Sequence, residues 1–227
     1  MTLPANAIDK LIAKVQNNVG RPGDSILADY TIEWINQGLK KVCNRMNFWF
    51  MRTNTTLSFA QGDLNKALPA NFKDEDGVYI LDSSTNTFIE LEYMDYVDYR
   101  REYDDVNQAQ PAHYMLDGAG NILLRPVPDA SYSVILDYWA YLADVVSGGA
   151  SNDLIDDYPD IVEAYATWKA FSNFTEVEDA STWKGIFEEA LQDLVAANAE
   201  RELPDEMVLR LRPDVKGSGI TRFRNRG

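Results

Sequence analysis

The chain has 227 residues, of which 45% are hydrophobic, and its formal net charge is −15. This length accommodates one large domain or a domain with an insertion, and the hydrophobic content excludes disorder across the whole chain. The negative charge argues against a surface that grips nucleic acid, and the single Cys43 excludes an internal disulfide bond.

Targeting signals are not evident. The N-terminus has no basic segment followed by an apolar core, and no apolar run approaches the ~20 residues of a transmembrane helix. We therefore expect no signal peptide and no membrane partner. The expected location is the cytoplasm in which the protein is made, or a particle assembled there.

Two amphipathic helices are predicted at the N-terminal end. Hydrophobic residues recur at helical spacing through residues 4–19, and a Gly-Arg-Pro-Gly run ends that helix. Asp24 or Ser25 can cap a second helix, which reaches about Asn47. We expect the two helices to pack as an antiparallel hairpin, because the second carries a broad apolar stripe of Leu27, Tyr30, Trp34, Leu39, Val42 and Met46.

A β region follows the aromatic cluster Phe48-Trp49-Phe50. Residues 53–59 are threonine-rich and alternate as a strand does, and residues 67–72 read as an extended segment. Short strands at 78–81 and 88–91 and a short helix at 93–103 complete the prediction for this part.

Residues 111–141 predict a three-stranded antiparallel meander. Strands 113–116 and 121–125 flank a glycine-containing turn, and two prolines end the second strand. The third strand, 132–141, carries large residues on both faces, so we expect both of its faces to be covered.

The C-terminal part predicts two more helices and a basic tail. A linker at 143–153 precedes a third helix that begins at Pro159, and a fourth helix extends from about 179 to 201. Residues 207–227 hold six basic residues and one acidic residue, a net charge of +5 in a chain of −15. We expect this segment to become ordered on an acidic partner.

The predicted fold class is therefore α+β: a four-helix body with an inserted antiparallel β domain and an extended C-terminal arm. The body comprises residues 1–50 and 154–203, and the β domain with its short helix comprises 51–142. The linker is 143–153, and the basic arm is 204–227.

No complete active-site or metal motif is evident. His113, the only histidine, is interpreted as a strand-edge residue without a partner, and Cys43 as a buried, inert thiol. No cysteine or histidine spacing fits zinc. The acidic clusters are interpreted as two solvated loops and one helix N-terminus; they are Asp74-Glu75-Asp76, Asp104-Asp105 and Asp153-Asp156-Asp157-Asp160. We predict no catalytic residue, no cofactor and no metal.

A glycine-containing segment and a group of tyrosines can each be interpreted either as a binding site or as part of the structure. Gly118-Ala119-Gly120 joins two strands, which favours a hairpin turn over a phosphate-binding loop. A group of tyrosines in the predicted short helix can stack on sugars or bases, but packing against a neighbouring protein is the preferred interpretation. These tyrosines are Tyr93, Tyr96, Tyr99 and Tyr103.

The order of these segments resembles the head-to-tail adaptor (connector) proteins of tailed bacteriophages. The likeness begins with a helical hairpin that carries Trp34 and ends in Phe48-Trp49-Phe50. It continues through Leu68-Pro69-Ala70-Asn71-Phe72, then Pro111-Ala112-His113-Tyr114, and then residues 120–129 leading into 132–141. Two closing helices and a basic tail complete the resemblance, which covers nearly the whole chain.

The resemblance implies a non-enzymatic virion protein assembled in the host cytoplasm. Such proteins form a homo-oligomeric ring, commonly of twelve copies, between the portal and the tail or nozzle proteins. The ring surrounds a channel through which genomic DNA passes at ejection without specific binding. An acidic wall suits this, because it repels phosphates.

In such rings the C-terminal segment often grips the portal protein. The matching segment here is residues 207–227, by position rather than by identical residues. Its arginines can pair with carboxylates and its phenylalanine can bury as an anchor, so the predicted portal-binding residues are Arg210, Arg212, Lys216, Arg222, Phe223, Arg224 and Arg226. The alternatives are a tail-associated carbohydrate-binding module that uses the tyrosine-rich β insertion, and a hydrolase that uses paired carboxylates.

Overall fold

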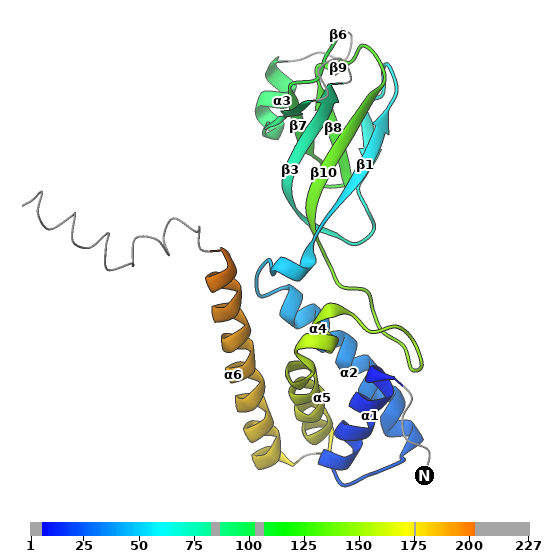
Figure 1. Ribbon diagram of the computed structural model, residues 1–227, viewed down its shortest axis with the longest axis vertical. Helices are drawn as coiled ribbons and strands as arrows, with labels where there is room; N and C mark the ends of the chain where they lie inside the picture. Colours follow the sequence, from blue (N-terminus) through cyan, green and yellow to red (C-terminus); the bar gives the residue numbers. More distant parts are fainter. Residues whose placement is uncertain (1–5, 83–86, 103–106, 175, 203–227) are drawn as a thin grey trace, which may run out of the picture. The chain divides into compact units, whose positions relative to one another are not determined.

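The computed structural model of the protein describes residues 6–82, 87–102, 107–174 and 176–202. The chain forms two compact units. We call Met1–Gly38 with Val146–Gly227 the helical unit and Leu39–Val145 the sheet unit. Six α-helices and mostly antiparallel sheets make the described part a mixed α+β protein (Figure 1).

Five helices contribute to the helical unit: α1 (Ala7–Asn18), α2 (Ser25–Cys43, whose last residues belong to the sheet unit), α4 (Asp153–Asp157), α5 (Pro159–Asn173) and α6 (Val177–Glu202). The predicted hairpin helices both form. Asn6 caps α1 by accepting from the Asp9 amide at 2.8 Å. The Asp24 carboxylate caps α2 by accepting from the Ile26 and Leu27 amides, both at 3.0 Å, as the sequence led us to expect.

Helix α5 packs against α6 through aromatic residues. The Tyr165 ring lies 5.1 Å from Phe187 and 5.4 Å from Trp168, both edge-on, a favourable geometry for aromatic pairs. On its other side Tyr165 meets α2 at Gly38, where a Cβ would lie 3.0 Å from the tyrosine ring. The absence of a side chain at Gly38 thus allows this close approach.

Helix α4 was not expected. Asn152 begins it by accepting from the Ile155 amide at 3.1 Å, and Leu154 and Ile155 are buried. Five residues are too few for a helical repeat to appear in the sequence.

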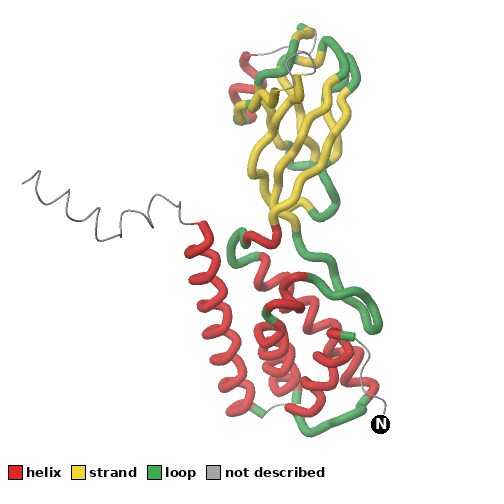
Figure 2. The backbone as a smooth tube through the Cα atoms, viewed as in Figure 1, coloured by secondary structure: helices red, strands yellow, loops and turns green. Residues whose placement is uncertain are grey.

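The sheet unit is a β-sandwich (Figure 2). The first sheet is antiparallel, in the order β1-β10-β3-β4, with β1 (Arg52–Phe59), β10 (Tyr132–Ala140), β3 (Phe72–Asp82) and β4 (Thr87–Glu90). The second has the order β2-β8-β7-β5, with β2 (Asn65–Ala67), β8 (Asn121–Arg125), β7 (His113–Leu116) and β5 (Glu92–Tyr93). Strands β6 (Gln108–Ala109) and β9 (Val127–Pro128) form a short parallel pair.

The core of the sheet unit lies between the two sheets. It includes Val78 and Ile80 from β3, Val134 and Leu136 from β10, and Leu124 from β8. The short helix α3 (Tyr96–Glu102) packs on the other side of the second sheet, where Met94, Tyr99 and Met115 cluster. The outer face of the first sheet carries exposed or half-buried side chains instead.

The predicted meander is only partly correct. Strands β7 and β8 form the expected antiparallel hairpin, but β10 does not join it. It pairs instead with β1 and β3, in the opposite sheet. Strand β8 ends at Arg125, just before Pro126 and Pro128, which lack amide donors for a strand ladder. The chain then crosses from the second sheet to the first, where β10 lies.

Three other expectations need correction. Residues Asp74-Glu75-Asp76 lie inside β3, not in a loop, and the β3–β10 register shifts nearby accommodate them. The face of β10 with Ile135 and Asp137 is half-buried, so the strand is not covered equally on both sides. Tyr30, placed in the buried stripe of α2, is 49% exposed.

Helix α2 also ends earlier than the expected Asn47. Lys73 of β3 donates its ammonium protons to the carbonyl oxygens of Cys43 and, at 2.8 Å, of Met46. These bonds satisfy acceptors that the end of a helix leaves free. Burial lowers the pKa of Lys73.

Two helix glycines provide a matched test of the packing in the helical unit. Gly38→Val should lower the free energy of unfolding by about 1–3 kcal/mol, because the added atoms collide with Tyr165. Gly185→Ala, in α6 with no atom within 4 Å of an added Cβ, should raise it by about 0.5–1 kcal/mol. Urea unfolding of the full chain measures both values, and equal effects would contradict the close packing at Gly38.

Candidate interaction surfaces

The predicted arm residues lie outside the described part of the chain. This holds for all seven of them: Arg210, Arg212, Lys216, Arg222, Phe223, Arg224 and Arg226. Their role in portal binding stays a prediction.

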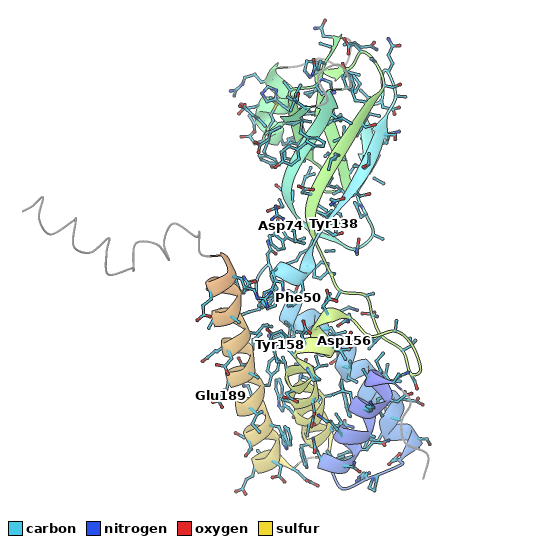
Figure 3. The ribbon with its side chains drawn as sticks, in the orientation of Figure 1. Phe50, Asp74, Tyr138, Asp156, Tyr158 and Glu189 are labelled. Carbon is cyan, nitrogen blue, oxygen red and sulfur yellow. The ribbon has the colours of Figure 1, made fainter. Side chains whose placement is uncertain are left out.

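Helix α6 presents an exposed stripe of acidic residues around one isoleucine. Its members are spaced by three, four or seven residues and lie on a side that does not face α5; they are Asp179, Thr182, Ile186, Glu189 and Asp193. Ile186 is 42% exposed, and Glu189 is labelled on α6 in Figure 3. We call this surface the α6 stripe.

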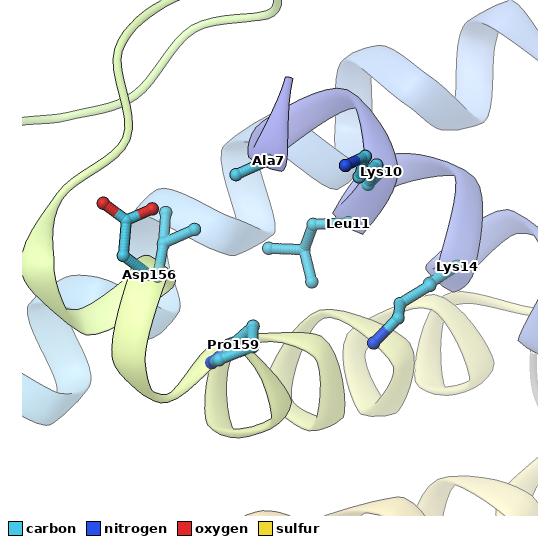
Figure 4. A pocket seen from close by; sticks show the side chains of 7 residues that line it. Ala7, Lys10, Leu11, Lys14, Asp156 and Pro159 are labelled. Atoms are coloured by element: carbon cyan, nitrogen blue, oxygen red, sulfur yellow. The ribbon is translucent and has the colours of Figure 1, made fainter. Parts of the chain in front are cut away.

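A small pocket on the same unit has the complementary chemistry (Figure 4). Its walls are apolar and come from α1, α4 and α5, namely Ala7, Leu11, Ile155 and Pro159, and its volume is about 220 Å³. The side chains of Lys10 and Lys14 lie on one side of it and Asp156 on the other. We call it the lysine pocket.

The charges around the lysine pocket are partly matched within the unit. Lys14 donates to Glu163 at 2.9 Å and lies 3.8 Å from Asp160, and the hydrogen bond to Glu163 is the main cause of its raised pKa. Asp156 accepts from the Ser151 hydroxyl at 2.6 Å. Lys10 is exposed and is the lysine best placed for an acidic group of another molecule.

The outer face of the first sheet in the sheet unit holds a second pocket, of about 360 Å³. It is lined by side chains from all four strands: Asn54, Tyr79, Phe88, Ile135 and Asp137. Phe88 is 61% exposed. Burial, with the carboxylates of Glu90 and Asp137, raises the pKa of Tyr79.

The tyrosines singled out from the sequence have different surroundings. Tyr93 and Tyr96 are more than half exposed, whereas Tyr99 is buried. The Arg125 guanidinium stacks on the Tyr99 ring at 4.0 Å, so this tyrosine fastens α3 to β8. Tyr103 lies outside the described residues.

The candidate catalytic groups are engaged in structure. His113 lies 3.6 Å from Glu92, so the expectation that it has no partner is wrong. Cys43 is buried as predicted, and burial raises the pKa of its thiol. Asp153 and Asp156 lie in the first turn of α4, where acids complement the helix dipole.

Over the described ranges, no group of three or more histidine, cysteine or acidic residues is arranged to hold a metal ion. Within those same ranges, no helix has the length and apolarity needed to cross a membrane.

Comparison with known proteins identifies a family. A family model described as "SU10 adaptor protein" matches residues 6–212, which is nearly the whole chain. No match was found among curated proteins. The matched residues include both the helices and the inserted sheets.

Proposed function

The chain belongs to the SU10 adaptor protein family, a phage head-to-tail adaptor family, and we propose that it forms the ring that joins the portal to the tail. In this proposal it is a virion component assembled in the host cytoplasm, and the ring, of twelve copies, lines part of the DNA channel. The family match over nearly the whole chain is the observation that carries the proposal.

A closed ring needs two different, complementary surfaces on each copy. The α6 stripe and the lysine pocket have that relation. Ile186 is an exposed apolar side chain with Glu189 and Asp193 further along the same stripe, and the lysine pocket is an apolar depression with Lys10 beside it. The stripe of one copy fits the pocket of the next, with the isoleucine in the depression and the acids toward the lysine side.

The basic arm docks on the portal. Residues 207–227 of the arm carry a net charge of +5, whereas the rest of the chain is acidic, so this segment is suited to carboxylates on a partner. Arginine pairs with carboxylates through two parallel hydrogen bonds. The sheet unit, in the same proposal, meets the tail or nozzle proteins.

The channel role is consistent with the charge of the chain. At −15 the protein repels DNA phosphates, which favours sliding over binding. The DNA then passes without sequence-specific contacts.

The proposed role is not enzymatic. A carboxylate-based hydrolase needs two acids facing a substrate across roughly 5–10 Å. A pocket of the helical unit that is lined by two acids holds Asp9 and Asp29. In this pocket Asp9 accepts from the Ser147 hydroxyl at 3.0 Å and from the Gly148 amide at 3.2 Å. Asp9 therefore holds the loop between β10 and α4.

Removal of residues 207–227 tests the arm. The truncated chain should keep its helical and sheet content but lose at least tenfold in affinity for the portal protein, because the basic residues are gone. Circular dichroism checks the fold and surface plasmon resonance measures portal binding. Portal binding that is unchanged by the truncation would contradict the role of the arm.

A substitution in the α6 stripe tests the contact between copies. Ile186→Lys should raise the concentration needed for ring assembly on the portal about tenfold or more, because a buried isoleucine contributes about 1.5–3 kcal/mol. Gln192→Lys is the matched control, since it adds the same charge at an exposed position of α6 outside the stripe. Sedimentation velocity of mixtures with the portal protein measures the concentration that each variant needs for ring assembly. The same concentration for both variants would rule out this interface.

A further inference from the structure

The outer face of the first sheet carries an aromatic ring that lies along the sheet. Tyr79 and Gly77 are two residues apart on β3 and share this face. A Cβ at Gly77 would lie 2.6 Å from the Tyr79 hydroxyl oxygen and 2.8 and 2.9 Å from two ring carbons. The ring therefore leans back over the glycine, and one of its flat sides is presented outward.

Polar side chains stand next to this ring. Asn54 on β1 is paired in register with Asp137 on β10, and Asp137 with Gly77 on β3. No hydrogen bond or ion pair joins the side chains of Asn54 or Asp137 to another described residue. An amide, which both donates and accepts, and a carboxylate, which accepts, are thus both available beside the ring.

The remaining positions extend the same surface. Ile135 is opposite Tyr79 in the register of β10 and β3, and Glu90 is opposite Tyr79 on the other side. Phe88 on β4 completes the pocket. The volume of about 360 Å³ falls within the range of pockets that hold small ligands.

The chemistry of this pocket matches one class of ligand. A sugar ring has an apolar face of C–H groups, which packs on a flat aromatic side chain, and a rim of hydroxyls, which need both donors and acceptors. The charges beside Tyr79 are those of Asp137, Glu90 and Asp76, the last paired with Arg52 at 2.6 Å. An excess of acidic groups repels phosphorylated, sulfated and carboxylated ligands.

We propose that the outer face of the first sheet is a binding site for neutral oligosaccharides, with Tyr79 as the stacking platform and Asn54 and Asp137 as hydrogen-bonding groups. Gly77 is a positioning residue, since it lets the ring lie flat. This site uses only the sheet unit and is independent of the contacts proposed for the ring and the arm.

The rival occupant is a basic peptide. A guanidinium can also stack on tyrosine and pair with a carboxylate. The polar pair Asn54 and Asp137 favours the sugar, because a protonated guanidinium accepts no hydrogen bond and makes no use of the amide donors of Asn54.

The test is binding of the full chain to an array of neutral oligosaccharides, followed by titration calorimetry with the best binder. We expect saturable binding that falls about tenfold or more in Tyr79→Ala. It should fall several-fold in Gly77→Ala, because the new methyl group displaces the ring. Gly118→Ala is the matched control, as nothing lies within 4 Å of an added Cβ there, and it should bind like the unmodified chain.

Three outcomes would overturn the proposal. They are the absence of binding to every neutral oligosaccharide, equal affinity of Tyr79→Ala and the unmodified chain, and preferential binding of a synthetic peptide of residues 207–227 at Tyr79. Circular dichroism of each variant confirms that a loss of binding does not arise from unfolding. Portal binding should be the same for all of them, which separates this proposal from the adaptor role.

Discussion

The sheet unit depends on one long strand, β10, which pairs with β1 on one side and β3 on the other. Its pairing of Trp139 with Arg52 brings together parts of the chain that are far apart in sequence and closes the β insertion. Such a pairing costs loop-closure entropy, which burial of Val134, Leu136 and other inward side chains offsets. The alternate residues of the same strand, Ile135 and Asp137, form the floor of the pocket on the outer face.

The sequence predicted the helices better than the strand pairing. Hydrophobic residues three and four apart identify α1, α2, α5 and α6, because helical contacts are local. Alternation along residues 132–141 correctly identifies a strand with Val134 and Leu136 on one face, but it carries no information about partners. The neighbour in sequence, β8, was therefore chosen wrongly over β1 and β3.

The tyrosines singled out from the sequence are not the residues that line the proposed oligosaccharide site. Tyr99, one of the four tyrosines singled out in the predicted short helix, is buried under Arg125, whereas Tyr79 is not one of those four. A usable signal was present, since a glycine two residues before an aromatic in a strand leaves room for the ring to lie flat. The partners Asn54 and Asp137 come from strands whose register no local pattern reveals.

The proposed function rests on surfaces of the two units rather than on an active site. The family match covers both units, and several described acids, together with His113, take part in helix caps, ion pairs and turns. In the proposed ring, the exposed Ile186 and the lysine pocket are the two unlike faces that neighbouring copies bring together. The sheet unit adds the outer face of the first sheet, which is the proposed oligosaccharide site.

The most direct test of the adaptor role is a mass measurement of the full chain, alone and mixed with the portal protein of the same phage. Native mass spectrometry or mass photometry is suitable. The adaptor role predicts a discrete complex that contains many copies of this chain, twelve in the proposed ring, on each portal. A chain that keeps the same mass with and without portal protein would contradict the adaptor role.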